Sequence, residues 1–213
     1  MPARKTAPKP AKPSPYDVHP SVAMVQTWIA ELPEKTGRTL DQWLRLLHRE
    51  GPDSPAQLRE WLKTRHGLGT NSAWWLAERA EGKGHEEDDP AVYLKTAERY
   101  VEEMYAGKKA ALKPIHDELL RLGRSMGSDV RVCPCKTIVP FYRKHVFAQI
   151  KPATLTRIDV GLALGDMKVP ERLIDTGGLE KKDRITHRIP ITSIAEIDEE
   201  VRRWMKTAYD REA

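Results

Sequence analysis

Residues 156–164 read TRIDVGLAL, and this stretch decides the fold class of the second half of the chain. Ile158, Val160, Leu162 and Leu164 alternate with polar or small residues. Strict alternation is typical of an antiparallel strand that buries one face. The stretch therefore predicts a strand in a sheet with one side covered and one side open.

More strands are predicted on both sides of this one. Val146, Ala148 and Ile150 alternate with Phe147 and its polar neighbours, so residues 146–151 predict a second strand with one buried face. Shorter strands are expected at residues 130–133, 137–141, 172–174 and 186–189.

Helices are predicted at both ends of this run of strands. Asp89–Pro90 suits the N-cap and first residue of one helix, and a second helix is expected at residues 114–122. Ser193 and Glu196 form a capping box that opens the last helix. Residues 91–213 are therefore expected to form an α+β domain, an antiparallel sheet covered by helices.

The preceding residues 20–83 are helical in pattern throughout. Apolar residues recur every three or four positions, and capping boxes begin at Thr39 and at Ser54, the latter followed by Pro55. Five of the six tryptophans fall between residues 28 and 75. We expect a small all-helical bundle whose core is built around large rings.

Two segments are predicted to lie outside these domains. Residues 1–19 are interpreted as a disordered basic tail, because the first fifteen hold five prolines, four cations and no acid. Residues 84–90, GHEEDDP, are interpreted as an exposed acidic linker.

The composition and the lack of long apolar runs argue against a membrane protein. The 213 residues are 39% hydrophobic and 31% charged, with a net charge of +5. No run approaches the roughly 20 apolar residues that a membrane helix needs, and no apolar run after the basic N-terminus suggests a secretory signal. We expect a cytoplasmic protein without a membrane partner.

The two cysteines admit three interpretations. Cys133-Pro-Cys135 is favoured as two thiols in a reduced strand, with half a metal site or a redox pair as alternatives. Zinc needs four ligands, and the histidines stand at no recognisable ligand spacing. No metal ligand, cofactor or catalytic residue is assigned from the sequence.

A helix-turn-helix is compatible with the turn at Gly67 and Gly69 and the helix start at Thr70. Residues 54–82, however, hold four cations against three acids, too little positive charge for the footprint that phosphate contacts require. A packed helical hairpin is the favoured interpretation.

Several motifs resemble two bacterial domain families. In the first half, Lys35–Gly37, Trp61–Lys63 and His66–Gly69 resemble the domain of unknown function 4287, although residues 70–72 (TNS) stand where histidines are expected in that family. The second half resembles the domain of unknown function 5655 at Val132–Thr137, His145–Pro152, Arg157–Gly161, Thr176–Gly178 and Lys182–His187. The resemblance implies a two-domain protein and names no reaction.

Positive charge gathers in the second half of the chain. Residues 131–188 hold twelve Lys and Arg against six Asp and Glu. If the strands ending at Ile150 and beginning at Thr156 pair as a hairpin, Lys151 and Arg157 share its polar face. The residues predicted to bind nucleic acid or another anion are Arg143, Lys144, Lys151, Arg157, Lys181, Lys182, Arg184 and Arg188.

The predicted function is low-specificity nucleic-acid binding by a non-enzymatic protein, through the basic tail and the basic sheet domain, with Tyr142 or Phe147 able to stack on a base. Two alternatives stay open. An enzyme acting on a small molecule or anion would use the sheet face, with Asp159 and either His145 or His187 as an acid–base pair. A protein-interaction adaptor would use the tryptophan-rich helical domain.

Overall fold

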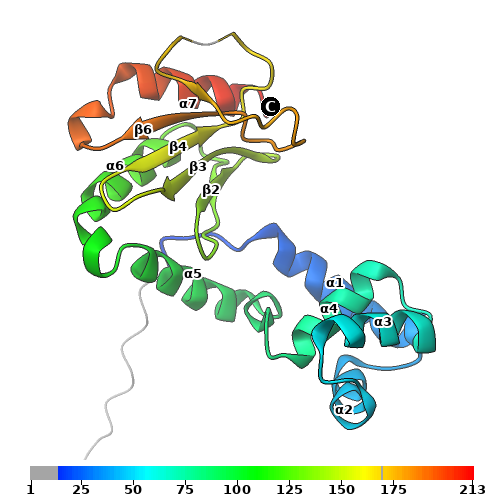
Figure 1. The fold of residues 1–213 in the computed structure, drawn as a ribbon. Coiled ribbons are helices and arrows are strands. Elements are labelled where there is room, and N and C mark those ends of the chain that lie inside the picture. The colour runs from blue at the N-terminus through cyan, green and yellow to red at the C-terminus, as the bar shows by residue number, and fades with distance from the viewer. Residues whose placement is uncertain (1–13, 169) are drawn as a thin grey trace, which may run out of the picture. The chain divides into compact units, whose positions relative to one another are not determined.

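The computed structural model describes residues 14–168 and 170–213, and they divide into two compact units (Figure 1). The helical unit is Val18–Arg99. The sheet unit joins residues 14–17 to Tyr100–Ala213. Residues 1–13 of the predicted tail lie outside the described residues.

Residues 14–19 differ from the prediction of a disordered tail. The backbone N–H of Asp17 donates to the carbonyl of Val132 over 2.8 Å, and the ring of His19 accepts from the N–H of Ser21 over 3.1 Å. The first contact joins residues more than a hundred positions apart. Composition alone gives no sign of it.

The helical unit confirms a small bundle. Its main helices are α1 (Pro20–Thr36), α2 (Leu40–Glu50), α3 (Pro55–His66) and α4 (Thr70–Ala80), followed by the first part of α5 (Pro90–Met104). Thr39 and Gln42 form the predicted capping box, whereas Ser54 caps α3 without a side-chain hydrogen bond. No helix among the described residues is long and apolar enough to span a membrane.

Only some of the tryptophans build this core. Trp43 and Trp75 are 1% and 7% exposed, but Trp28 and Trp74 are 37% and 51% exposed. Trp74 and Trp75 are adjacent in α4, and neighbouring helical residues project about 100° apart, so one faces the core and the other faces outward. The remaining core is aliphatic and includes Leu62 and other buried leucines.

The predicted acidic linker is folded onto the helical unit. Residues His85–Glu87 form the short helix η1, and the Asp88 carboxylate pairs with Arg79 over 2.9 Å. The Arg79 side chain is only 1% exposed and also donates to the carbonyl of Lys83. A buried guanidinium requires such a carboxylate, so part of the acidic run serves a local ion pair instead of forming an exposed joint.

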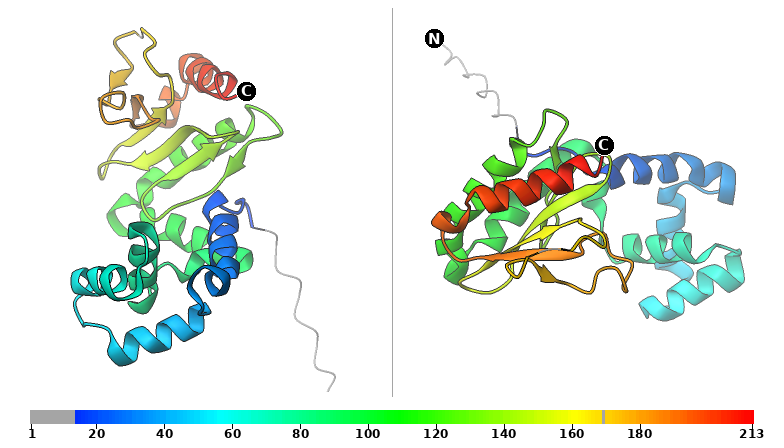
Figure 2. Two further views of the ribbon diagram at one scale, coloured as in Figure 1. Left: turned by 90° about the vertical axis from the view of Figure 1, so that its right-hand side faces the viewer. Right: turned by 90° about the horizontal axis from the view of Figure 1, so that it is seen from above.

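The sheet unit confirms the α+β class. Its strands are β1 (Arg131–Val132), β2 (Val139–Tyr142), β3 (Val146–Pro152), β4 (Ile158–Leu162), β5 (Ile174–Asp175) and β6 (His187–Ile191). They form one sheet in the order β1-β2-β3-β4-β6-β5, with every pair antiparallel (Figure 2). β3 and β4 pair as the predicted hairpin, with Lys151 opposite Asp159.

A β-bulge overturns the predicted role of Phe147. The register of β2 and β3 shifts between Phe141 and Tyr142, where Tyr142 pairs with Val146 and Phe141 pairs with Ala148. The additional residue breaks the alternation, so Phe147 and Ala148 are both fully buried. Phe147 packs against other core rings and is not available to stack on a base.

The last helix begins later than predicted. Residues Ile194–Glu196 form the short helix η3, and α7 (Glu199–Asp210) is capped by Asp198, whose carboxylate accepts from the N–H groups of Glu200 and Val201. The Thr192 N–H and hydroxyl donate to the Glu196 carboxylate, so Glu196 is used outside the predicted capping box.

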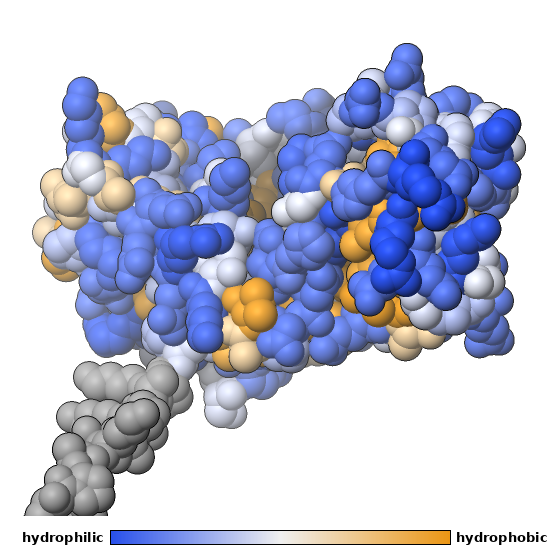
Figure 3. Space-filling model, turned by 90° about the horizontal axis from the view of Figure 1, so that it is seen from below, coloured by the Kyte–Doolittle hydropathy of each residue, from blue (hydrophilic) through white to orange (hydrophobic). Residues whose placement is uncertain are grey.

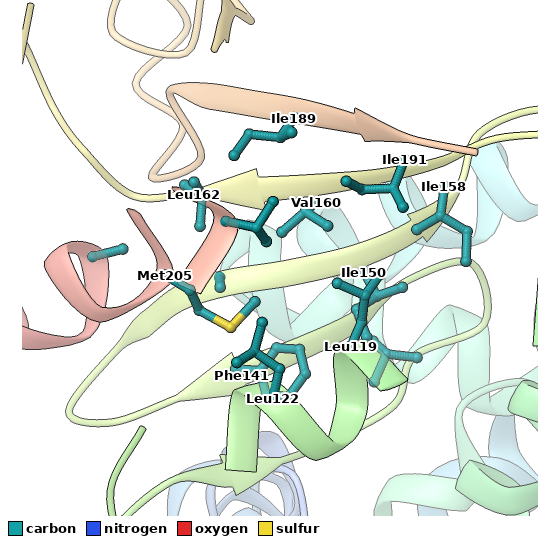
Figure 4. Packing of buried hydrophobic residues seen from close by; sticks show 14 of the residues in the cluster. Leu119, Leu122, Phe141, Ile150, Ile158, Val160, Leu162, Ile189, Ile191 and Met205 are labelled. Carbon is teal, nitrogen blue, oxygen red and sulfur yellow. The ribbon is translucent and has the colours of Figure 1, made fainter. Parts of the chain in front are cut away.

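Two helices cover one face of the sheet. Figure 4 shows Leu119 and Leu122 of α6 (Lys113–Arg124) and Met205 of α7 among the buried side chains of β3 and β4. α6 approaches the sheet closely at Gly123, where an added Cβ would lie 2.2 Å from the fully buried ring of Phe141. Glycine is required there so that the helix can reach the sheet.

We expect Gly123→Ala to destabilise the protein. Alanine improves helix propensity by about 1 kcal/mol, but overpacking a closed core costs about 1–3 kcal/mol. Because the Phe141 ring is fully buried and would lie 2.2 Å from the new methyl group, the steric cost should be the larger, and urea unfolding should show a net loss. The same change in a Phe141→Leu background should cost less; an equal cost in both backgrounds would show that the ring is not the obstacle.

The core of the sheet unit also holds a buried histidine. His116 of α6 lies 4.7 Å from the Tyr105 ring centroid, and neither of its nitrogens has a hydrogen-bond partner among the described residues. Burial lowers the pKa of His116 to about 4, and nearby Lys113 acts in the same direction while Asp117 opposes it. His116 is therefore neutral near pH 7.

Acid should weaken the fold through His116 before the carboxylates titrate. Its pKa falls on folding from 6.5 to about 4. This contribution is intact above pH 6.5 and is lost as pH falls toward 4, by about 3 kcal/mol in all. Urea unfolding at several pH values should show this slope, and His116→Leu should flatten it. Exposed His48→Leu is the control, and an unchanged slope in His116→Leu contradicts the assignment.

Candidate nucleic-acid interface

The sheet register separates the eight cationic residues predicted to bind nucleic acid. Lys151 and Arg157 lie at one end of the β3–β4 ladder, where Pro152 pairs with Ile158. Five others precede β3 or β6 and so lie at the opposite end: Arg143, Lys144, Lys181, Lys182 and Arg184. Arg188 pairs with Gly161 between the two ends. The structure therefore does not bring the eight together.

Asp159 neutralises two of the predicted arginines. Its carboxylate lies 2.9 Å from Arg157 Nε and 3.1 Å from Arg188 Nη1. The Asp159 side chain is 13% exposed, so this pairing is shielded from water. Arg157 and Arg188 therefore form ion pairs on the open face of the sheet. The Asp159 carboxylate offsets part of their positive charge, so less of it is available to a ligand.

The other two predicted arginines are paired as well. Arg143 Nε donates to the Asp129 carboxylate over 2.9 Å, and its guanidinium lies 4.3 Å from the Tyr209 ring centroid. The hydrogen bond from the Tyr209 hydroxyl, followed by that from Arg143, lowers the pKa of Asp129, which stays ionised. Arg184 pairs with Glu212.

The four predicted lysines are exposed. Lys144 and Lys151 lie at the two ends of β3, and Lys181 donates to the carbonyl of Thr176 over 2.9 Å. Lys182 adopts a left-handed backbone with φ of 56° in the turn before β6. These side chains keep their charge toward solvent.

Lys151 belongs to a cleft that sequence reasoning did not find. The cleft has a volume of about 650 Å³, and four lysines line it: Lys108, Lys109, Lys136 and Lys151. Its apolar lining comes from Met104, Pro152 and Leu155, and its other lining residues are Glu103, Ala106 and Thr137. We call this the lysine cleft.

Three separate segments supply those lysines. Lys108 and Lys109 lie in the short helix η2 (Gly107–Leu112), which begins at Gly107 with a left-handed φ of 57°. Lys109 Nζ donates to the carbonyl of Pro152 over 2.8 Å and so ties η2 to the end of β3. The adjacent lysines after a glycine are a visible signal, but nothing in the sequence places them beside Lys151.

The lysine cleft is suited to anions. Four ammonium groups and one carboxylate, that of Glu103, surround it, so it carries a local positive potential. Ammonium groups pair with phosphate as flexible point charges, and the apolar lining can take the face of a base or a sugar. Contacts of these two kinds do not depend on which base is present, so such a cleft can bind strands of different sequence.

The acid–base pair of the enzyme alternative is not assembled. Asp159 points from the open face of β4, whereas His187 is buried on β6 with its Nδ1 2.9 Å from the Thr186 hydroxyl. His145 Nδ1 lies 3.0 Å from Glu212 instead. Neither histidine contacts Asp159.

The thiols of Cys133 and Cys135 are both reduced, and Cys133 is buried. Burial raises the pKa of Cys133 to about 12, so its thiol is protonated and unreactive near pH 7. Within residues 14–168 and 170–213, no group of three His, Cys, Asp or Glu side chains is placed to hold a metal ion.

The helix-turn-helix interpretation of α4 stays a prediction, because Thr70, Asn71 and Ser72 at the start of this helix are all exposed. Asn71 and Ser72 line a small pocket of about 110 Å³ together with Trp28 of α1 and Trp75. On the face seen in Figure 3, hydrophobic residues form separate spots on a mostly hydrophilic surface.

Releasing the arginines from Asp159 should strengthen polyanion binding. Asp159→Asn keeps the shape of the side chain and removes its charge, so the protein should elute from heparin, a sulfated polyanion, at higher salt. Arg157→Gln should matter little in the natural chain and more in the Asp159→Asn background. Equal effects in both backgrounds would mean that Arg157 is not held by Asp159. Thermal melting of each variant checks the fold.

Comparison with known families covers both units. Residues 24–81 match the family described as Domain of unknown function (DUF4287). Residues 101–212, more than half of the chain, match the family described as Domain of unknown function (DUF5655). Neither the comparison with curated proteins nor that with solved structures gives a match. The chain therefore belongs to the DUF5655 family, with a DUF4287 domain in its N-terminal half.

Proposed function

We propose that the protein binds nucleic acid with little sequence specificity and holds the strand in the lysine cleft. The observation that carries the proposal is the convergence of four lysines from three chain segments on one cleft with an apolar lining. Phosphates pair with the ammonium groups, and bases or sugars rest on Met104, Pro152 and Leu155.

In this proposal the arginines that form ion pairs and the lysines of the cleft have different roles. The predicted arginines each hold a carboxylate of this chain, whereas Lys151 and its three neighbours in the cleft face solvent or one backbone carbonyl. Lysines release counterions from a phosphate backbone without a fixed geometry. Affinity should therefore depend strongly on salt and weakly on base sequence.

The lysines at the opposite end of the sheet have a supporting part. Lys144, Lys181 and Lys182 are exposed but do not line the cleft. They attract a polyanion over distances of about the Debye length, roughly 8–10 Å at physiological salt. They also provide a control group of equal charge.

Charge reversal tests the cleft directly. Lys136→Glu with Lys151→Glu should raise the Kd for a single-stranded oligonucleotide by tenfold or more, to be measured by fluorescence anisotropy. Each lost phosphate contact should also reduce the slope of log K against log salt by about 0.7 on a single strand.

The matched control is Lys181→Glu with Lys182→Glu, which changes the net charge by the same amount. It should have a smaller effect that largely disappears at about 0.15 M salt. If both pairs weaken binding equally, overall charge and not the cleft carries the interaction. Unchanged affinity after reversal in the cleft overturns the proposal, provided that thermal melting shows an intact fold.

A further inference from the structure

Leu155 is an exposed apolar side chain in the lining of the lysine cleft. It is 51% exposed, whereas Met104 and Pro152, the other two residues of the apolar lining, are buried. A single exposed leucine on a protein surface needs no explanation by itself. Leu155 differs from such a residue because it shares one cleft with four lysines.

The loop that carries Leu155 is closed by local hydrogen bonds. Leu155 lies between β3 and β4, and the backbone N–H of Thr154 donates to the carbonyl of Arg157 over 3.2 Å. The Thr154 hydroxyl accepts from the N–H of Thr156 over 3.3 Å. Both sequence neighbours of Leu155 are therefore held, and the leucine has a defined position at the turn of the β3–β4 hairpin.

This end of the hairpin is also joined to the segments that carry the lysines. Lys109 Nζ donates to the carbonyl of Pro152 at the end of β3. The pairing of Val139 with Ile150 brings the residues just before β2, including Lys136, to the same end of the sheet. The cleft therefore presents ammonium groups and one exposed apolar side chain to the same ligand.

The two kinds of group suit different parts of a nucleic acid. Ammonium groups pair with the phosphates of single and double strands alike. The face of a base, in contrast, is open in a single strand and covered by stacked neighbours in a duplex. The cleft is also small, because a cube of 650 Å³ is about 9 Å on each side and the major groove of a duplex alone is about 12 Å wide.

We infer that Leu155 makes the lysine cleft selective for single-stranded nucleic acid, through contact with the face of an unpaired base. This inference rests on the proposed function and specifies its partner as a strand whose bases are exposed. The contact is apolar, so it adds to the affinity without adding to the salt dependence.

Substitution of Leu155 in two directions tests this contact. Leu155→Ser should raise the Kd for a single strand of about 20 nucleotides by about fivefold or more. Leu155→Phe should lower that Kd, because a flat ring stacks on a base, and misfolding would not produce tighter binding. Neither change should alter the slope of log K against log salt, and both variants should bind a duplex of the same length as the natural chain does.

Leu179 supplies the matched control. It is a leucine of the same unit that is 56% exposed and does not line the cleft, so Leu179→Ser and Leu179→Phe should leave the Kd unchanged. A single strand of abasic residues, which has phosphates and sugars but no bases, is the second control. It should bind the Leu155→Ser protein and the natural chain equally tightly. Thermal melting of each variant checks the fold.

The outcomes separate this inference from the proposed function. If Lys136→Glu with Lys151→Glu leaves the Kd for the single strand unchanged, the proposed function itself fails. If that reversal weakens binding but Leu155→Ser has no effect, or an equal effect on all three nucleic acids, the cleft binds phosphates only and the inference is wrong. A loss confined to the duplex would make Leu155 a wedge between base pairs, which also overturns the inference.

Discussion

Apolar contact between one face of the sheet and the helices α6 and α7 is the constraint on which the sheet unit depends. It fixes which side chains of β3 and β4 point inward, and therefore leaves Lys151 and Asp159 on the other side. It also draws α6 so close to β2 that position 123 must be glycine. η2 is followed directly by α6, so the packing of α6 on the sheet also places Lys108 and Lys109 beside the end of β3.

Ion pairing then decides how much of the positive charge reaches the surface. The four arginines among the predicted binding residues each meet a carboxylate of the same unit: Asp129, Asp159 or Glu212. Arginine suits this role because its planar donor group matches a carboxylate, whereas lysine remains a hydrated point charge on a flexible stem. Among the eight predicted binding residues, the four arginines are therefore engaged in ion pairs, whereas the four lysines are exposed and pair with no carboxylate among the described residues.

The sheet unit is not one continuous segment of the chain. Residues 14–17 belong with Tyr100–Ala213, and the whole helical unit is inserted between them in sequence. The hydrogen bonds between Asp17 and Val132 therefore make residues 14–17 a part of the unit that contains the lysine cleft. A fragment that begins at residue 91 or 101 would lack Asp17 and expose the edge of β1.

The sequence by itself determined the features that depend on local periodicity. Alternation predicted β3, β4 and their hairpin, and capping residues predicted the start of α2 and α5, where Asp89 accepts from two N–H groups. The motifs also identified both families. These features were readable because each depends on residues only a few positions apart.

Only the tertiary structure decided what depends on contacts between separate elements. The bulge that buries Phe147 needs the facing strand β2, and the Arg79–Asp88 pair needs the fold of the helical unit. The hydrogen bonds between Asp17 and Val132 join residues more than a hundred positions apart. The lysine cleft is of the same kind, because more than forty residues separate Lys108 from Lys151. A periodic pattern reports which face of an element is buried, but it does not report which elements meet.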